Sequence, residues 1–463
     1  MEKEIIRKKY ARITFTIDSP LAIGSGENRY TDSDIIKDRN GKPYIPASAI
    51  AGVTREILSG SVIDENEINT YFGNVNKNTH KTDKNAKYNK QDEKANNVES
   101  SVIFYDATLK NDSPCHISIR DNVALDEYKT AKKGAKFDME VLEAGAKFET
   151  YLEQSFYEGV DVDYIDKIVD VLHSGKVRFG GKTMRGYGNT CDVCINEKEF
   201  IFKSKKENGK EQDLENVEKW LEFDIYNYPW KEEESKTVDD SKIERKKELV
   251  INLRQNGGIS IRKYATRVQK DENDIVPDYE QLTAFITEHD TEAVMPVIPG
   301  TSWAGAFRHR MKDFGINVDE SGSIFGYVKG KMREKSKISF SESRISGAMA
   351  KTLSHNAIDR FTSGTVEGAL FKEQTYYYGT TKLIIGWNGG TMDNETKSAL
   401  AATIADIHYG FLAVGGETSI GRGLFTVDEI NGKKINDSGG VGDSEIYKIA
   451  LQSIEEVFSN DSK

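Results

Sequence analysis

Two glycine-rich segments carry the residues of this chain that are best suited to chemistry. GGKTMRGYG begins at Gly180, and GGETSIGRG begins at Gly415, 235 residues later (415 − 180 = 235). Glycine lets backbone N–H groups approach a polyanion closely, and Lys182 adds a cation to the first segment. A tight helix-to-strand connection would need glycine for its geometry alone, but two segments in register favour phosphate binding. The candidate residues are Gly180, Gly181, Lys182, Arg185, Gly186, Gly188, Gly415, Gly416, Gly421, Arg422 and Gly423.

A second pair of segments shows that the repetition extends along the chain. PASAIAGVTR begins at Pro46 and PGTSWAGAFR begins at Pro299, an offset of 253 residues (299 − 46 = 253). A Phe-Gly pair follows each copy at that same offset, at residues 72–73 and 325–326. Two ordered motif pairs with nearly constant offsets indicate a duplicated domain.

The same order of elements is predicted in both copies. Alternating apolar residues predict strands, and helical spacing that ends near a glycine predicts helices. In the first copy we expect strands at 12–18, 101–109, 147–153 and 187–195, with helices at 48–60 and 163–175. In the second we expect strands at 248–254, 337–343, 381–387 and 423–429, with helices at 301–315 and 395–410. Ser48 is the expected N-cap of its helix. The order β-α-β-β-α-β is the ferredoxin-like (RRM-like) unit, so the predicted class is α+β.

We therefore expect two domains, residues 1–235 and 236–463, joined through a charge-dense linker that begins at residue 203 and contains a short helix at ENVEKWLEF. Residues 74–100 are rich in asparagine and lysine and nearly devoid of apolar groups, which predicts a mobile insertion. Its lysines could contact phosphates, although a solvated loop accounts for the same composition.

Composition excludes several classes of protein. The 463 residues contain no apolar run that approaches a membrane span, no signal-like segment and three cysteines, so we expect a cytoplasmic protein without a disulfide framework. A formal net charge of −11 argues against a free-standing nucleic-acid binder. It does not exclude RNA, because basic residues can line one groove while acids cover other faces.

Metal and histidine chemistry have weaker support. Cys191 and Cys194 form a CxxC pair, but in a strand these positions face opposite sides, so strand packing is favoured over a zinc site completed by Cys115-His116. His309 and His355 could act as general acids, although hydrogen bonding in a loop or hairpin is the simpler interpretation.

Several strings together resemble the RAMP superfamily of CRISPR-associated proteins, and in particular the backbone subunits of type III effector complexes. The strings are TDSDIIKDRNGKPYIPASAIAGVTR at 31–55, RDNVALD at 120–126, GAKFDMEVLEAGAKFE at 134–149, HNAIDRFTSGTVEGALF at 355–371, the Phe-Gly pairs and the glycine-rich segments. Two such domains in one chain look most like the fused subunits of III-D-like complexes.

The resemblance implies partners and further site residues. A ferredoxin-like palm would hold guide (CRISPR) RNA, thumbs near 118–146 and 345–379 would wedge between guide and target RNA, and other subunits of the complex would bind alongside. The RNA-binding candidates on this basis are Ser48, Arg55, Ser302, Arg308 and His355. Arg262, Lys263 and Arg267 form a basic cluster suited to phosphates.

The resemblance also implies catalysis. Asp32 stands where catalytic members carry an aspartate that cuts target RNA, and it would take the 2′-OH proton or hold a divalent ion (Mg or Mn); no organic cofactor is implied. Asp34 departs from the family pattern, and Asp38 is expected in the turn DRNGKP. In the second copy the candidate is Asp278, with Asp274 second. Asp278 precedes its helix by 21 positions rather than 14, a difference that a loop insertion near TEHDTEA could absorb.

Three functions stay open at this point. The chain could be a backbone subunit that cuts target RNA with one or both domains, or a non-catalytic scaffold for guide RNA. It could also be an endonuclease that processes repeat RNA. The absence of histidine near Asp32 and Asp278 in the sequence disfavours the last.

Overall fold

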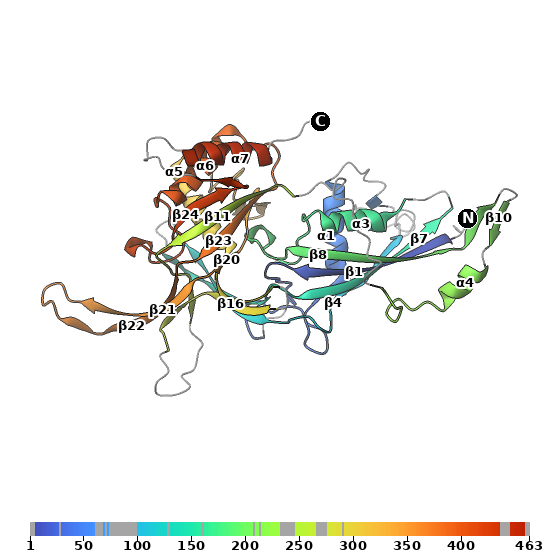
Figure 1. The fold of residues 1–463 in the computed structure, drawn as a ribbon, viewed down its shortest axis with the longest axis horizontal. Coiled ribbons are helices and arrows are strands. Elements are labelled where there is room, and N and C mark those ends of the chain that lie inside the picture. The colour runs from blue at the N-terminus through green and yellow to red at the C-terminus, as the bar shows by residue number, and fades with distance from the viewer. Residues whose placement is uncertain are drawn as a thin grey trace, which may run out of the picture.

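A computed structural model of the chain describes most of its residues. The described ranges are 5–26, 29–60, 68–69, 72–73, 100–126, 130–158, 162–206, 209–212, 214–231, 246–264, 276–288, 291–435 and 445–458. The two halves of the chain form separate bodies that meet edge to edge (Figure 1). Each of the two largest hydrophobic clusters contains residues of one half alone. This agrees with two domains, although the expected boundary at 235/236 and nearly all of the expected insertion lie outside the described residues.

The first domain is a six-stranded antiparallel sheet with helices on one face. In spatial order its strands are β2 (Tyr44–Ile45), β4 (Ala107–Leu109), β7 (Lys147–Tyr157), β1 (Ile5–Ile17) and β8 (Thr190–Ile201), with β3 (Val102–Phe104) also paired to β7. Helices α1 (Ala47–Ser59) and α3 (Tyr164–His173) lie side by side on it. Alternation along β1 explains the burial, because Ile13, Phe15 and Ile17 point into the core and are at most 2% exposed.

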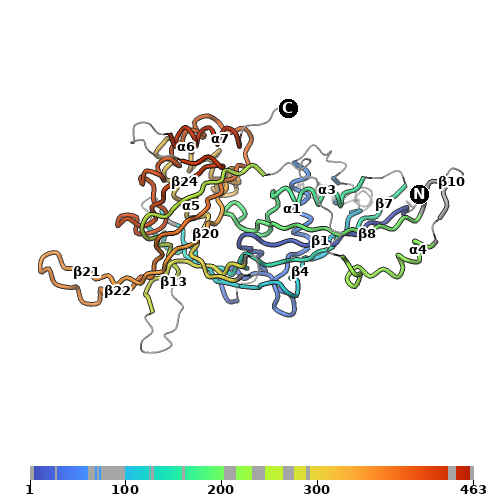
Figure 2. Tube along the Cα trace, viewed as in Figure 1, coloured from blue at the N-terminus to red at the C-terminus, as the bar shows by residue number. Residues whose placement is uncertain are grey.

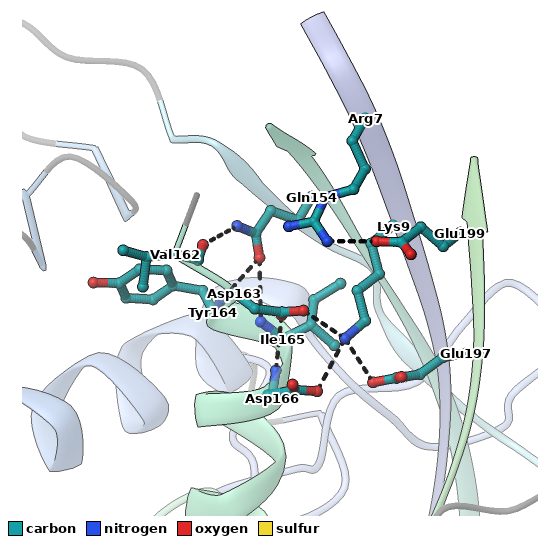
Figure 3. A network of polar contacts seen from close by, with 10 residues as sticks. All are labelled: Arg7, Lys9, Gln154, Val162, Asp163, Tyr164, Ile165, Asp166, Glu197 and Glu199. Carbon is teal, nitrogen blue, oxygen red and sulfur yellow. Dashed lines mark hydrogen bonds and ion pairs between the residues drawn. The ribbon is translucent and has the colours of Figure 1, made fainter. Parts of the chain in front are cut away.

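Helix α3 is fixed to the sheet by polar contacts at its first turn (Figure 3). The Asp163 carboxylate caps the helix by accepting the Asp166 N–H. Lys9 of β1 pairs with Asp163 at 2.7 Å, Asp166 at 2.9 Å and Glu197 of β8 at 2.9 Å. Burial alone would lower the pKa of Lys9, but these three carboxylates raise it above its usual value.

The second domain repeats this plan around a central strand β11 (Glu248–Asn256). In spatial order its strands are β15 (Thr283–Glu288), β16 (Thr291–Ile298), β20 (Ser343–Ser346), β23 (Thr380–Trp387), β11, β24 (Leu424–Ile430) and β25 (Lys433–Lys434), with β19 (Ile338–Phe340) paired to β23. The helices are α5 (Gly300–Asp313), α6 (Asn394–His408) and α7 (Glu445–Phe458). In Figure 1 they lie together over one face of this sheet.

Each domain also carries a β-hairpin between its central strands. In the first domain it consists of β5 (Ile117–Leu125) and β6 (Ala131–Leu142), and in the second of β21 (Met349–Ile358) and β22 (Thr365–Tyr377). Figures 1 and 2 show β21–β22 projecting far from the body of its domain. Its base joins a small sheet with β12 (Gly258–Ile259), β13 (Arg262–Tyr264) and β14 (Tyr279–Gln281). A further small hairpin, β17 (Tyr327–Lys329) and β18 (Met332–Glu334), follows α5.

Most elements expected from the sequence are present, with two differences of detail. Ser48 does not cap α1, because the helix begins one residue earlier with Pro46 in the cap position and has no side-chain cap hydrogen bond. The strands expected at 101–109 and 337–343 are each divided, the first into β3 and β4 and the second into β19 and β20. The additional length near TEHDTEA is taken up by the β15–β16 hairpin, as expected.

Residues 203–231 stay with the first domain. After a short hairpin of β9 (Lys203–Lys206) and β10 (Gly209–Gln212), helix α4 (Leu214–Leu221) and the residues after it pack against the face of the sheet that lacks α1 and α3. Trp220 Nε1 donates to the Tyr10 hydroxyl at 2.8 Å, and Tyr226 packs edge-on to Tyr151. The charge-dense segment is thus partly a folded aromatic arm.

The two domains touch through the first glycine-rich segment and the β15–β16 hairpin. A Cβ at Gly186 would lie 2.6 Å from the Phe340 carbonyl oxygen, and one at Gly300 would lie 2.4 Å from the Arg185 carbonyl oxygen. At the hairpin, His116 Nε2 lies 2.9 Å from Glu292, and its ring stacks on Phe285. Backbone-to-backbone approach of this kind leaves no room for side chains at the glycine positions.

Candidate nucleic-acid interface

Asp32 lies in an exposed loop that runs beside strand β6. Its backbone N–H donates to Asp138 Oδ1 at 2.9 Å, and the Asp138 N–H donates to Asp32 Oδ2 at 3.0 Å. The carboxylate of Asp32 is therefore fixed through one oxygen. Its other oxygen, Oδ1, has no hydrogen-bond donor among the described residues, and Asp32 is exposed.

Further contacts extend the attachment of this loop to β6. The Glu140 N–H donates to the Ser33 carbonyl at 3.1 Å, and the Glu140 carboxylate accepts the Ile35 N–H at 3.1 Å. Lys37 Nζ pairs with both oxygens of the same carboxylate at 2.9 Å. The loop thus lies parallel to the hairpin strand from Asp32 to Lys37.

Asp34 organises the loop from within. Its carboxylate is buried and accepts the N–H groups of Arg29, Tyr30 and Thr31 and the Thr31 hydroxyl. Burial raises its pKa, but these hydrogen bonds outweigh that effect and lower the pKa of Asp34 to about 2. Asp38 accepts the N–H groups of Asn40 and Lys42, so it belongs to the turn as expected.

Asp278 has the corresponding position in the second domain. It is exposed, its N–H donates to the Lys372 carbonyl at 2.8 Å, and its Oδ2 accepts the Lys372 N–H at 2.7 Å. Lys372 lies on β22 and Asp138 on β6, 234 positions apart (372 − 138 = 234). This offset agrees with that of the other hairpin motifs, so the structure makes Asp32 and Asp278 equivalent. Asp274 lies outside the described residues.

The first glycine-rich segment places a cation against the other side of β6. Lys182 has a φ of 57°, its Nζ lies 2.9 Å from Met139 Sδ, and it lies over the Phe137 ring at 4.1 Å from the centroid. Burial and the neighbouring Arg185 cation lower the pKa of Lys182 to about 8. An ammonium group with no carboxylate partner among the described residues is well suited to a phosphate oxygen.

The second glycine-rich segment has the opposite charge at this position. Glu417 stands where Lys182 does, and it accepts from Arg262 at 2.8 Å. Arg422 is 6% exposed and pairs with Glu373 at 3.2 Å, while it also contacts the Tyr377 hydroxyl. The charges here are neutralised within the protein, which leaves the second segment without the free cation of the first.

Glycines in both segments are required by contacts within the protein. A Cβ at Gly180 would lie 2.5 Å from the Ala22 carbonyl oxygen, and one at Gly415 would lie 2.6 Å from that of Ser260. Gly188 and Gly423 would each place a Cβ 1.9 Å from a backbone oxygen of their own domain. The two N–H groups that follow in the turn, of Gly181 and Gly416, donate to those same Ala22 and Ser260 carbonyls. Tight packing therefore accounts for these glycines. The prediction that the first segment binds phosphate then depends on Lys182 and Arg185.

The remaining candidates are spread over both domains. Arg55 donates to the Gly73 carbonyl and to Asn69, and Arg308 pairs with Asp319, so each arginine ties its helix to the segment that follows. His355 stacks on its cross-strand partner Phe371 in the outer half of β21–β22, with Nε2 3.4 Å from Glu373.

Ser48 is exposed and Ser302 is half-buried, near the starts of α1 and α5 respectively. Lys263 is half-buried beside Arg262, which lies over the Tyr279 ring at 4.2 Å from its centroid. Arg267 lies outside the described residues.

Sequence reasoning did not identify several features of the hairpins and the loop. Phe361 at the tip of β21–β22 is 95% exposed, and Ile358 and Leu370 beside it are more than 60% exposed. Asp138, which contacts Asp32, has no signal in the sequence beyond its place in the hairpin. An exposed apolar tip on a projecting hairpin is suited to insertion between stacked bases.

The described residues include no group of three or more His, Cys, Asp or Glu side chains that could hold a metal ion by themselves. Cys191 and Cys194 lie in β8 and are free, as is Cys115. The Asp32 carboxylate is exposed and keeps one oxygen without a hydrogen-bond donor among the described residues. Mg²⁺ is often bound by one or two carboxylates with the remaining ligands from substrate phosphates and water, so Asp32 fits such an ion.

Fold and site together define a duplicated α+β protein with one hairpin-anchored aspartate in each domain. A family model described as the RAMP superfamily matches residues 14–191 and 283–426, more than half of the sequence. The chain belongs to the RAMP superfamily.

No curated protein matches the sequence. Among solved structures, a chain of the "Cryo-EM structure of the Type III-B Cmr-beta bound to cognate target RNA" is similar at 18% identity with a TM-score of 0.30. The similarity covers 41% of this chain and 61% of that one. No helix in the described part of the chain is both long and apolar enough to span a membrane.

Proposed function

We propose that this chain is an RNA-binding backbone subunit of a cytoplasmic type III CRISPR ribonucleoprotein. It holds guide RNA and cleaves the bound target RNA through Asp32 in the first domain and Asp278 in the second. One observation carries the proposal: both aspartates are anchored through Oδ2 to the equivalent N–H of equivalent hairpin strands. Membership of the RAMP superfamily supports the RNA-binding part.

The arrangement of strands supports a ferredoxin-like palm in each domain. In the first domain the order β8-β1-β7-β3, with α1 and α3 on one face, is that of a split β-α-β unit in which the outer strands follow the helices. In this proposal the hairpins β5–β6 and β21–β22 are the thumbs. In this proposal their exposed apolar residues, such as Phe361, separate stacked bases of the target and kink it beside the aspartate.

The chain's own residues account for the main steps of the proposed reaction. Lys182 and Arg185 bind phosphate of the RNA and fix its position relative to β6. Asp32 accepts the proton of the ribose 2′-OH at its open oxygen, and the 2′ oxygen attacks the adjacent phosphorus. The P–O5′ bond breaks and the leaving O5′ takes a proton from water, so the products are a 2′,3′-cyclic phosphate and a 5′-hydroxyl. A divalent ion held by Asp32 and by phosphate oxygens of the RNA would supply charge stabilisation for the phosphate.

The test is target-RNA cleavage by the purified ribonucleoprotein. Asp32→Asn and Asp278→Asn each keep a carbonyl oxygen that can accept the hairpin N–H, but they remove the base. Each should abolish one product band of end-labelled target, and the double variant should abolish both. Guide-RNA retention should be unchanged, because loss of the base affects rate rather than affinity.

Each outcome of this experiment assigns a function. Persistence of both bands at wild-type rates in the double variant would make the chain a scaffold without cleavage activity. Loss of the Asp32 band alone, with the other unaffected by Asp278→Asn, would restrict the enzyme to the first domain.

A further inference from the structure

Asp32 is held by a side chain from another part of the fold, while Asp278 is held by backbone alone. In the second domain the Asp278 N–H donates to the carbonyl of Lys372. In the first domain the Asp32 N–H donates instead to the carboxylate of Asp138. Any residue at position 372 has a carbonyl, so the second attachment does not depend on side-chain identity. The first depends on an acceptor side chain at position 138.

We propose that Asp138 is a positioning residue for Asp32, so that the first cleavage site is complete only while β6 lies against the Asp32 loop. This inference rests on the proposed cleavage function. The two hydrogen bonds of 2.9 Å and 3.0 Å form a closed ring between the two residues, which fixes the loop backbone and the Asp32 carboxylate together. A single bond would leave the carboxylate free to rotate about its own side-chain torsions.

The same short stretch of β6 also fixes the phosphate-binding cation. Phe137 and Met139, on either side of Asp138, contact Lys182. The Asp32 loop bonds to the Asp138 and Glu140 N–H groups along the edge of β6, whereas Lys182 lies against the Phe137 and Met139 side chains. Strand β6 therefore sets the distance between the base and the phosphate, and movement of the hairpin changes both contacts at once.

Such a distance matters because catalysis is sensitive to placement. A displacement of about 1 Å can reduce a rate on the order of a hundredfold. Loss of the Asp138 acceptor leaves Asp32 chemically intact and the Glu140 contacts in place, but it releases the Asp32 N–H and loosens the loop at that residue. The expected result is a slower chemical step with unchanged affinity for guide and target RNA.

The experiment compares Asp138→Ala, Asp138→Asn and Asp121→Ala in the assembled ribonucleoprotein. Asp121 lies directly across the hairpin on β5, so its substitution removes the same charge without touching the loop. Asp138→Ala should slow the Asp32-dependent product about tenfold or more while the Asp278-dependent product is unchanged. Asp138→Asn should stay within about threefold of wild type, because its amide oxygen still accepts the N–H. Asp121→Ala should behave as wild type.

A second measurement separates this inference from the proposed function. Hydrogen exchange of the backbone amides at 31–35 should be faster in Asp138→Ala than in wild type or Asp138→Asn, whether or not the protein cuts RNA. If Asp32→Asn removes no product, cleavage by Asp32 is refuted but the exchange result still tests positioning. Equal exchange in all three proteins, or an Asp138→Asn variant as slow as Asp138→Ala, would overturn the positioning role.

Discussion

The guanidinium of Arg120, in the first hairpin, is buried against the carboxylate of Glu342 in the second domain. It also pairs with Glu143 of its own domain at 2.6 Å, and the three side chains are each at most 5% exposed. Burial alone would lower the pKa of Arg120, but the two carboxylates raise it. Burial raises the pKa of Glu342 despite Arg120. One cation thus joins the base of the first hairpin to the neighbouring domain.

Replacement of Arg120 by methionine should destabilise the protein by about 3–5 kcal/mol, because it leaves two buried carboxylates without a cation. The folded-state pKa of Glu342, which burial already raises, would then lie further above its unfolded value. Stability is in that case retained below the unfolded pKa and lost as the pH rises through the folded pKa. The deficit relative to wild type, measured by denaturant unfolding, should therefore be smaller at pH 5 than at pH 8. The triple variant Arg120→Met/Glu143→Gln/Glu342→Gln should recover part of the lost unfolding free energy. An equal loss in Arg120→Met at pH 5 and pH 8 would contradict this account.

Gly186 and Gly421 form a matched pair for testing the domain contact. Their φ values are 87° and 82°, so alanine introduces similar backbone strain at both positions, about 1 kcal/mol. At Gly421 no described atom outside its immediate chain neighbours lies within 4 Å of a Cβ, whereas at Gly186 the Phe340 oxygen would lie 2.6 Å away. Gly186→Ala should lower the melting temperature clearly more than Gly421→Ala. Equal shifts would show that the domains separate easily in solution.

The lowered pKa of Lys182 predicts a pH-dependent contact with RNA. In the proposed function protonated Lys182 binds phosphate, and the charge is lost as the pH rises through about 8 unless bound phosphate raises the pKa of Lys182. Affinity for RNA should therefore fall between pH 7 and pH 9. Lys182→Met should weaken binding at pH 7, reduce this pH dependence, and lower the slope of log affinity against log salt by about one. A pH dependence that is the same in wild type and Lys182→Met would exclude this contact.

Asp34 should contribute to stability through its ionised form. Its folded pKa of about 2 lies below the usual value of 3.8, so the contribution is present above pH 4 and is lost as the pH falls towards 2. Asp34→Asn should melt at a lower temperature than wild type at pH 7, and the difference should shrink on acidification. Because Asp34 orders residues 29–31, the Asp32-dependent product should also form more slowly. A constant difference in melting temperature across this pH range would show that the effect of the substitution does not depend on the charge of Asp34.

The repeated motifs made the plan of both domains predictable, because apolar spacing depends only on neighbouring residues. Ile13, Phe15 and Ile17 are buried as their alternation predicts. Helix α7 lies beyond the repeated motifs, yet Ile446, Ala450, Ile454 and Phe458 recur every four residues and are buried against the core. Such spacing is a sufficient signal for a helix of this kind. The N-cap at Ser48 was wrong because Pro46 already occupies the cap position.

The candidate site was only partly predictable, because its contacts join distant residues. Asp32 and Asp278 could be chosen from local motifs, but the contact of Asp32 with Asp138 spans 106 positions and depends on how the hairpin docks. The glycine-rich segments look alike in sequence, although their charges have different surroundings. Arg422 is buried and pairs with Glu373, whereas the Lys182 ammonium group has no carboxylate partner among the described residues.

The contact between Gly186 and Phe340 does not need to be strong to persist. Two domains on one chain meet in an intramolecular event, at an effective concentration that depends on the length and stiffness of the connection between them. A contact too weak to hold separate proteins together can therefore remain closed here. Joining the two copies in one polypeptide also fixes their ratio and their order. Under the proposed function, a target RNA that crosses both domains therefore meets Asp32 and Asp278 once each and in a fixed order. Separate subunits would have to establish that order each time they assemble.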